Sequence, residues 1–307
     1  MAKRILDCNA SDFEKMGKDD LLFSIGAGEG RALACETIGC FTPLLNDVTN
    51  AELVSALGAD ILLLNIFDVN DPQIQGLPPV APEDVVREVK RLTGRPVGIN
   101  LEPVEQSFAD QVDTMWSMTP GRLATLENGK KAADMGVDFI LLTGNPGTGV
   151  TNKAIIETLE LYHQHLGDRI VLAAGKMHNS GVLGEGGEKI LTKEEVKAFA
   201  DAGADVILLP APGTVPGITV KYASKLVAYA HSLKKLTMTS IGTSQEGADV
   251  ETIRRIALMS KMTGTDIHHI GDSGFTGIAA PENITAYSVV IKGVRHTYRR
   301  MAMSIKR

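Results

Sequence analysis

The amino-acid sequence predicts an α/β fold of the (β/α)8 TIM-barrel class, with a single domain over residues 1–307. Eight apolar, β-branched runs recur along the chain, and each is followed by a loop rich in glycine and asparagine and then by a helical pattern. Several runs are also introduced by the same phrase, in which a helix ends at glycine and an aspartate precedes the next run, as in Gly58-Ala59-Asp60 and Gly264-Thr265-Asp266. Such equivalent units favour a closed barrel over an open, doubly wound sheet.

The predicted strands are near-continuous apolar runs, which is typical of parallel strands covered on both faces. They span residues 21–25, 60–67, 96–101, 138–143, 170–174, 205–209, 236–241 and 266–270. The predicted helices span residues 50–57, 82–92, 122–135, 152–166, 192–202, 219–232, 249–262 and 281–304, of which the last is long. A short lead-in helix at about residues 10–17 is expected to close the bottom of the barrel. Chemistry is then expected on the loops that follow the strands.

Composition and charge exclude several function classes. Hydrophobic residues make up 44% of the chain and charged residues 22%, which is ample for a barrel core and gives no sign of disorder. The formal charge of −6, without a Lys/Arg cluster, argues against a nucleic-acid partner, whereas small anions remain compatible because backbone N–H groups bind them. Three cysteines without CxxC spacing, and the lack of any uninterrupted apolar stretch of about 18 residues, predict a cytoplasmic protein with no membrane partner.

Two small-residue loops after the seventh and eighth strands carry the strongest functional signal, because barrels frequently hold a phosphate there. The first contains Gly242, Thr243 and Ser244, and the second contains Gly271, Asp272, Ser273 and Gly274. Glycine lets the backbone approach an anion, hydroxyl groups add donors, and the next helix contributes its positive end. We therefore predict a phosphate site, with tight turns that need glycine as the alternative.

The loop after the fourth strand, residues 144–153, is also rich in glycine. It is not a Walker motif, because no Gly-Lys-Ser/Thr follows at the right spacing. We expect Thr143 and Asn145, at the strand tip, to donate hydrogen bonds to a substrate carboxylate or phosphoryl group. A turn that caps the next helix is an equally consistent interpretation.

Lys176 directly follows the fifth strand. A lysine at a strand tip, against the apolar wall of the barrel, can have a lowered pKa and act as a base or form a Schiff base. A solvated loop lysine is the alternative, and His178 is a weaker candidate. His268 and His269 are adjacent on the last strand, so at most one of these two side chains points into the lumen.

Amide and carboxylate side chains end the second and third strands. If they point inward, Asn65, Asn100 and Glu102 converge at the barrel mouth and place a carboxylate base beside two amides. Together with Asp68 and Asp272, Glu102 also offers oxygen ligands for Mg²⁺, the one candidate cofactor. Hydrogen bonds to loop backbones are the alternative role for such side chains.

The chain resembles the phosphate-binding barrels as a group. In places it looks like the BtpA-type barrel proteins, through Val97-Gly98-Ile99-Asn100 on the third strand and Leu142-Thr143-Gly144 on the fourth. A second resemblance is to the phosphoenolpyruvate/pyruvate barrels, which include isocitrate lyase and phosphonopyruvate mutase relatives. Where those relatives are expected to carry a Lys-x-Cys-Gly lid, Lys176 here is followed by Met177-His178-Asn179.

These observations lead to one favoured hypothesis and two alternatives. The favoured one is an enzyme that binds a small phosphorylated or carboxylated metabolite and performs lyase or isomerase chemistry next to a carbonyl, with Lys176 and Glu102 as the reacting pair. The first alternative is Mg²⁺-assisted C–C or C–P bond chemistry or phosphate-ester hydrolysis at Asp68, Glu102 and Asp272. The second is a non-catalytic assembly or regulatory factor, as the BtpA-type resemblance implies. The apolar face of the last helix is explained first by core packing and second by a homo-oligomer interface, and a homo-oligomer is expected.

Overall fold

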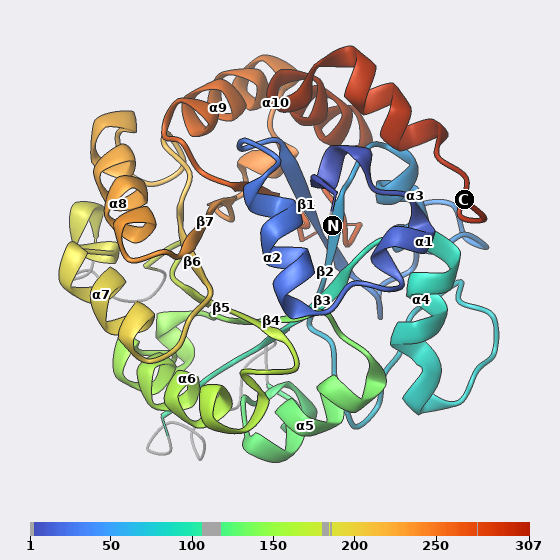
Figure 1. Cartoon of the computed structure of the whole chain (residues 1–307), viewed down its shortest axis with the longest axis horizontal. Coiled ribbons are helices and arrows are strands. Elements are labelled where there is room, and N and C mark those ends of the chain that lie inside the picture. The colour runs from blue at the N-terminus through green and yellow to red at the C-terminus, as the bar shows by residue number, and fades with distance from the viewer. Residues whose placement is uncertain (1–2, 106–117, 180–183, 185, 275) are drawn as a thin grey trace.

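Eight parallel strands form a closed barrel in the order β1-β2-β3-β4-β5-β6-β7-β8, with helices around its outside (Figure 1). The computed structural model describes residues 3–105, 118–179, 184, 186–274 and 276–307. The strands are β1 (Ala32–Ile38), β2 (Ile61–Asn65), β3 (Val97–Leu101), β4 (Phe139–Leu142), β5 (Val171–Gly175), β6 (Val206–Pro210), β7 (Leu236–Ile241) and β8 (Ile267–Ile270). The predicted fold class is therefore confirmed, and β2 to β8 lie within two residues of their predicted bounds.

Two helices precede the first strand, and the others follow the strands as the sequence pattern indicates. They are α1 (Ala10–Phe13), α2 (Lys18–Gly26), α3 (Asn50–Ala56), α4 (Val85–Thr93), α5 (Leu126–Met135), α6 (Asn152–Leu166), α7 (Lys193–Asp201), α8 (Val220–Ser232), α9 (Val250–Met262) and α10 (Pro281–Ala302). Threonines 49, 125, 151, 192 and 219 each accept a hydrogen bond at a helix N-terminus. The long last helix is interrupted at Gly293, whose φ of 74° and ψ of 164° are not helical.

The prediction for the first strand was wrong. Residues 21–25 lie in α2, and β1 begins at Ala32. A five-residue apolar run does not by itself distinguish strand from helix, whereas Leu21, Ser24 and Ile25 are buried at helical spacing. Helix α2 crosses the centre of the ring in Figure 1 and packs against residues at the bottom of the lumen such as Ile61. It therefore closes the barrel, and the predicted lead-in helix is reduced to the single turn of α1.

Each aspartate of the repeated phrase ties the start of an even-numbered strand to the strand before it. In each case the Oδ2 atom accepts a hydrogen bond from a backbone N–H of the preceding strand. The pairs are Asp60 with Leu33 at 2.9 Å, Asp138 with Val97 at 2.8 Å, Asp205 with Leu172 at 2.9 Å and Asp266 with Thr237 at 2.8 Å. The preceding glycines, Gly58, Gly136, Gly203 and Gly264, have φ between 86° and 110°, a conformation that favours glycine. The phrase therefore has a structural role at the bottom of the barrel.

Every one of these aspartates also has a cationic or histidine partner. Lys90 lies 2.8 Å from Asp138, Lys18 lies 2.7 Å from Asp205, and His231 lies 2.8 Å from Asp266. The fourth, Asp60, is fully buried and pairs with both Lys292 and Arg300 of α10. This pairing fixes the last helix to the start of β2.

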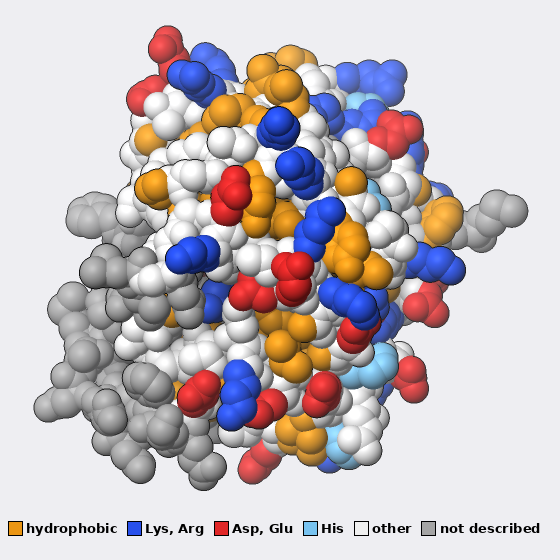
Figure 2. All heavy atoms as spheres, turned by 90° about the vertical axis from the view of Figure 1, so that its left-hand side faces the viewer, with side chains coloured by type: hydrophobic (Ala, Val, Ile, Leu, Met, Phe, Trp, Pro, Cys, Tyr) orange, Lys and Arg blue, Asp and Glu red, His pale blue; other side chains and the backbone are white. Residues whose placement is uncertain are grey.

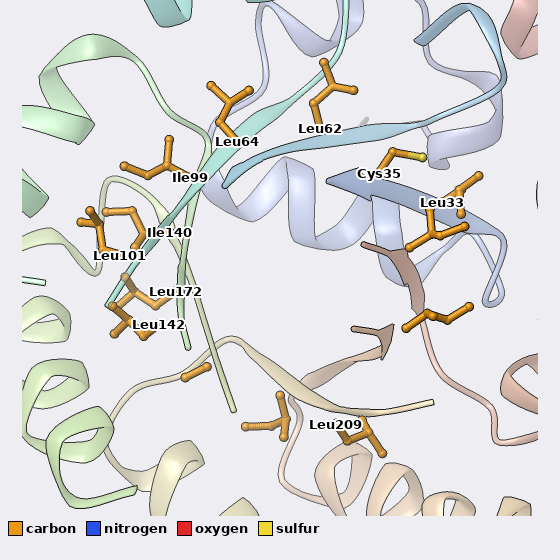
Figure 3. Packing of buried hydrophobic residues seen from close by; sticks show 14 of the residues in the cluster. Leu33, Cys35, Leu62, Leu64, Ile99, Leu101, Ile140, Leu142, Leu172 and Leu209 are labelled. Atoms are coloured by element: carbon orange, nitrogen blue, oxygen red, sulfur yellow. The ribbon is translucent and has the colours of Figure 1, made fainter. Parts of the chain in front are cut away.

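Two layers of apolar side chains make up the core. Outward-facing strand residues, including Leu62, Leu64, Ile99, Ile140 and Leu172, point away from the barrel axis toward the helices (Figure 3). Inward-facing residues fill the lower lumen, including Ala34, Ile61, Leu63, Phe139, Leu141, Val206 and Leu208. The upper lumen positions are instead polar, and this change places the site at the carboxyl ends of the strands.

The outer surface carries charges of both signs. On the side of α7 and α8, lysine and arginine side chains are interspersed with aspartate and glutamate (Figure 2). Among the described helices, none combines the length and the apolarity that a bilayer-spanning segment requires.

Candidate active site at the barrel mouth

A cavity of about 280 Å³ opens at the carboxyl ends of the strands. Its charged and polar lining residues are Glu36, Asn65, Asn100, Glu102, Arg122, Thr143, Asn145, Thr148, His178, Glu246 and Asp272, with Gly144, Gly242, Gly271 and Gly274 supplying backbone. The position is the one at which barrel enzymes build their active sites. The cavity is therefore the candidate active site.

A pair of carboxyl groups occupies one side of this cavity. Glu36 comes from the inward face of β1, and Asp272 follows β8. The Nδ2 atom of Asn65, at the end of β2, donates to Glu36 Oε1 at 2.7 Å and to Asp272 Oδ2 at 3.1 Å. Burial, the charge of Glu36 and a hydrogen bond with Glu36 together raise the pKa of Asp272 to about 7. Burial also raises the pKa of Glu36, and two adjacent carboxyl groups of this kind titrate as a coupled pair.

His269 lies directly below this pair on β8. Its Nδ1 atom is 2.7 Å from Ser240 Oγ, and its Nε2 atom is 3.0 Å from Glu36 Oε2, although this second contact does not have hydrogen-bond alignment. Burial lowers the pKa of His269 to about 4, so the imidazole is neutral at pH 7. The cross-strand pairs Ala34–His269 and Ser240–His269 place all three residues on the lumen face. Of the two adjacent histidines, His269 is thus the one in the lumen.

Glu102 and Arg122 form an ion pair on the opposite side of the cavity. Backbone hydrogen bonds of 2.9 Å, from Glu102 N to Arg122 O and from Ala124 N to Glu102 O, hold the returning chain against the end of β3. Burial raises the pKa of Glu102, while the Arg122 guanidinium acts in the opposite direction. The Arg122 Nε atom is buried and has no hydrogen-bond partner among the described residues. The pair thus leaves a guanidinium donor at the cavity wall.

Several other buried polar atoms of the cavity wall have no partner within the described part of the chain. They are Asn100 Oδ1, Thr143 Oγ1, His178 Nδ1 and Glu246 Oε2. Burial lowers the pKa of His178, which keeps this imidazole neutral. Unpaired buried polar atoms are rare in proteins and often mark a binding or catalytic role.

The structure brings most of the predicted site residues together. The cavity is lined by Asn65, Asn100, Glu102, Thr143, Asn145, Gly242, Gly271, Asp272 and Gly274. Asn145 also caps a turn, since its Oδ1 atom accepts a hydrogen bond from Gly147 N at 2.8 Å. Lys176 is 1% exposed at the tip of β5, and the cavity wall there is formed by the next two residues, Met177 and His178.

The hydroxyl groups of the predicted phosphate loops are used differently. Thr243 Oγ1 donates to Thr214 O at 2.9 Å, and Ser273 Oγ donates to Ile278 O at 2.6 Å, so both hydroxyls stabilise loops. Ser244 is exposed, and none of these three residues lines the cavity. A Cβ atom on Gly242 would lie 2.2 Å from Met177 Sδ, so a larger residue here would force the Met177 side chain to move.

The three carboxylates predicted to bind Mg²⁺ do not form one donor set. Glu102 and Asp272 line the cavity, but Asp68 does not. The Asp68 Oδ1 atom accepts backbone N–H bonds from Asn70 at 2.7 Å and from Asp71 at 3.2 Å. Within the described ranges, no group of three or more His, Cys, Asp and Glu side chains is placed to hold a metal ion.

Sequence reasoning missed Glu36, Glu246 and Arg122. Glu36 was missed because the first strand was placed too early in the chain, although a glutamate inside the apolar run Ala32–Ile38 was a usable signal. Arg122 reaches the cavity only because the chain returns to the end of β3, as the bridge between Glu102 and Leu123 shows. Glu246 lies two residues after Ser244 in the predicted phosphate loop, but it was not singled out because a carboxylate does not fit an anion site.

The family of this chain is shown by a match over nearly its whole length. A family model described as a domain of unknown function (DUF7916) matches residues 6–307. The chain belongs to that family. No curated protein matches the sequence.

Solved structures of low sequence identity share the fold of this DUF7916 member. An archaeal fructose 1,6-bisphosphate aldolase is 14% identical with a TM-score of 0.57, and the match covers 89% of this chain and 98% of the aldolase. A Schiff base forming fructose-1,6-bisphosphate aldolase is 13% identical with a TM-score of 0.52, covering 90% of this chain and 95% of that one. At these identities the likeness shows the barrel fold alone.

Proposed function

We propose that this protein is an enzyme of the lyase or isomerase type, which moves a proton next to the carbonyl group of a small metabolite. The observation that carries the proposal is the Glu36–Asp272 pair at the barrel mouth, bridged by Asn65. A general acid or base works best when its pKa lies near the operating pH, and the pKa of Asp272 is about 7. The solved structures of similar fold support only the location of the site at the barrel mouth, and they do not support the reaction.

Five residues in and beside the cavity have distinct roles in this proposal. The Glu36–Asp272 pair accepts the proton from the carbon and returns it, with the shared proton moving between the two carboxyl groups. Arg122, held by Glu102, directs its buried Nε–H at the substrate oxygen and stabilises the negative charge of the enolate. His269 packs below Glu36, with its Nε2 atom 3.0 Å from Glu36 Oε2.

Hydrogen exchange with solvent tests this proposal without knowledge of the substrate. A mixture of small aldehydes, ketones and 2-oxo acids is incubated with the protein in D₂O, and deuterium incorporation beside the carbonyl is followed by mass spectrometry. We expect incorporation into one class of compound, with a loss of about 10²-fold or more in Asp272→Asn, as for removal of a general acid or base. Asp68→Asn is the matched control, because Asp68 lies outside the cavity.

Two results would contradict the proposal. One is the absence of exchange in any compound that binds, which would favour the non-catalytic alternative. The other is exchange that Asp272→Asn and Glu36→Gln leave unchanged.

A second candidate function is a lyase that forms a Schiff base at Lys176. Its support is the position of Lys176, which is buried at the tip of β5 and directly precedes Met177 and His178 of the cavity wall. One of the aldolases of similar fold is described as Schiff base forming. Borohydride reduction in the presence of the carbonyl mixture, followed by intact-mass measurement, should then give an adduct that Lys176→Met abolishes. An unmodified wild-type protein would remove this candidate.

A further inference from the structure

The unpaired polar atoms of the cavity wall include both acceptors and donors. Asn100 Oδ1 accepts hydrogen bonds, as does Glu246 Oε2 when its carboxyl group is ionised. Arg122 Nε only donates, and Thr143 Oγ1 does both. Asn100, Thr143 and Glu246 are 8%, 4% and 7% exposed, so each is at least nine-tenths buried against the cavity. A ligand that satisfies this wall must carry several groups that donate and accept at neighbouring positions, which is the property of hydroxyl groups.

The charges around the cavity disfavour an anionic ligand on the side of β1, β7 and β8. Glu36, Glu246 and Asp272 all lie there, while Arg122, the arginine among the described lining residues, is already paired with Glu102. The predicted phosphate loops follow β7 and β8 and therefore lie on this same side. The hydroxyl groups of Thr243 and Ser273 in these loops already donate hydrogen bonds to backbone carbonyl oxygens. A phosphate group placed there would meet carboxyl groups without a free cation from the described lining residues.

We propose that the ligand of the barrel mouth is an unphosphorylated polyhydroxy carbonyl compound, of the free aldose or ketose type. Hydroxyl groups of this ligand pair with Asn100, Thr143 and Glu246, and its carbonyl oxygen faces Arg122. The role given to the carbonyl group rests on the proposed function, whereas the ligand class is tested by binding measurements without any catalytic assay. The proposed ligand therefore differs from the phosphorylated metabolite that the loop sequences predict.

The test is calorimetric titration with matched pairs of probes. Fructose and xylose are each compared with their monophosphate esters, and an aliphatic diamine serves as the cationic probe. We expect at least one free sugar to bind about tenfold or more tightly than its ester and than the diamine. Thr143→Val should weaken sugar binding by about tenfold, because it leaves a sugar hydroxyl unpaired. Thr243→Val is the control that should not change it, since Thr243 does not line the cavity.

Glu246→Gln gives an independent check of the charge argument. It removes one carboxyl charge with little change of shape, and should improve binding of the monophosphate ester about tenfold more than binding of the free sugar. Unfolding of each variant is measured first, so that a loss of binding is not confused with a loss of structure.

The possible results separate this inference from the proposed function. Tighter binding of the ester or of the diamine, or no binding of any free sugar, overturns the inference. Exchange of deuterium into a phosphate ester only would support the proposed function and overturn the ligand class. Binding of a free sugar without any exchange would support the ligand class and contradict the proposed function.

Discussion

Replacing Asp272 with asparagine should stabilise the protein above neutral pH. In the folded state the pKa of Asp272 is raised to about 7 from an ordinary value of 3.8, chiefly by burial and then by Glu36. Between these two values the folded protein holds a proton that the unfolded chain has released, so the free energy of unfolding falls as the pH rises through this window. Asparagine removes this penalty because it does not ionise.

The size of the effect follows from the shift. About three pKa units at 1.36 kcal/mol each correspond to an upper limit of about 4 kcal/mol. Because the Asp272 side chain is partly exposed, screening by solvent reduces this figure, and we expect a gain of about 2 kcal/mol.

Urea unfolding at several pH values measures this prediction. The difference between Asp272→Asn and wild type should be close to zero at about pH 4 and about 2 kcal/mol at about pH 8. Asp68→Asn is the opposite control, since hydrogen bonds from the Thr119 side chain and from backbone N–H groups together outweigh the effect of burial and lower the pKa of Asp68. An Asp272→Asn variant that is equally stable to wild type at both pH values, or less stable at pH 8, would refute the reasoning.

Two further predictions concern the fold. Asp60→Asn should lower the free energy of unfolding by about 3–5 kcal/mol in urea, because it leaves the buried cations Lys292 and Arg300 without their carboxylate; a loss below about 1 kcal/mol would contradict this. Gly98→Ala should lower the melting temperature by an amount equivalent to about 1–3 kcal/mol, because its Cβ would lie 2.4 Å from the Phe139 ring in the lumen; an unchanged melting temperature would show that the ring has room to move.

The barrel was predictable because its sequence signals are local and repeated. The phrase that ends in Asp60, Asp138, Asp205 or Asp266 marks the start of an even-numbered strand, and the structure shows why, since each carboxylate binds the neighbouring strand. None of the odd-numbered strands follows this phrase, so they had to be placed from their apolar runs alone. The run at residues 21–25 of α2 was mistaken for the first strand, because a short, mostly apolar run fits a strand as well as a helix.

The site was only partly predictable, since its geometry depends on contacts distant in the chain. Inward-facing residues at strand ends, such as Asn65 and Asn100, were found from strand position alone. The pairing of Glu36 with Asp272 joins the first strand to the last, and no spacing in sequence indicates it. The glycine-rich loops were ambiguous for a physical reason, because glycine serves tight turns and anion sites equally well.

The most direct test of this account is a titration of the Asp272 and Glu36 carboxyl groups by ¹³C NMR in the labelled protein. We expect two coupled steps, with an apparent pKa near 7 that falls in Glu36→Gln because the neighbouring charge and hydrogen bond are lost. If both carboxyl groups titrate near the ordinary value for their type, the pair holds no proton at neutral pH, and the proposed proton transfer at the barrel mouth is contradicted.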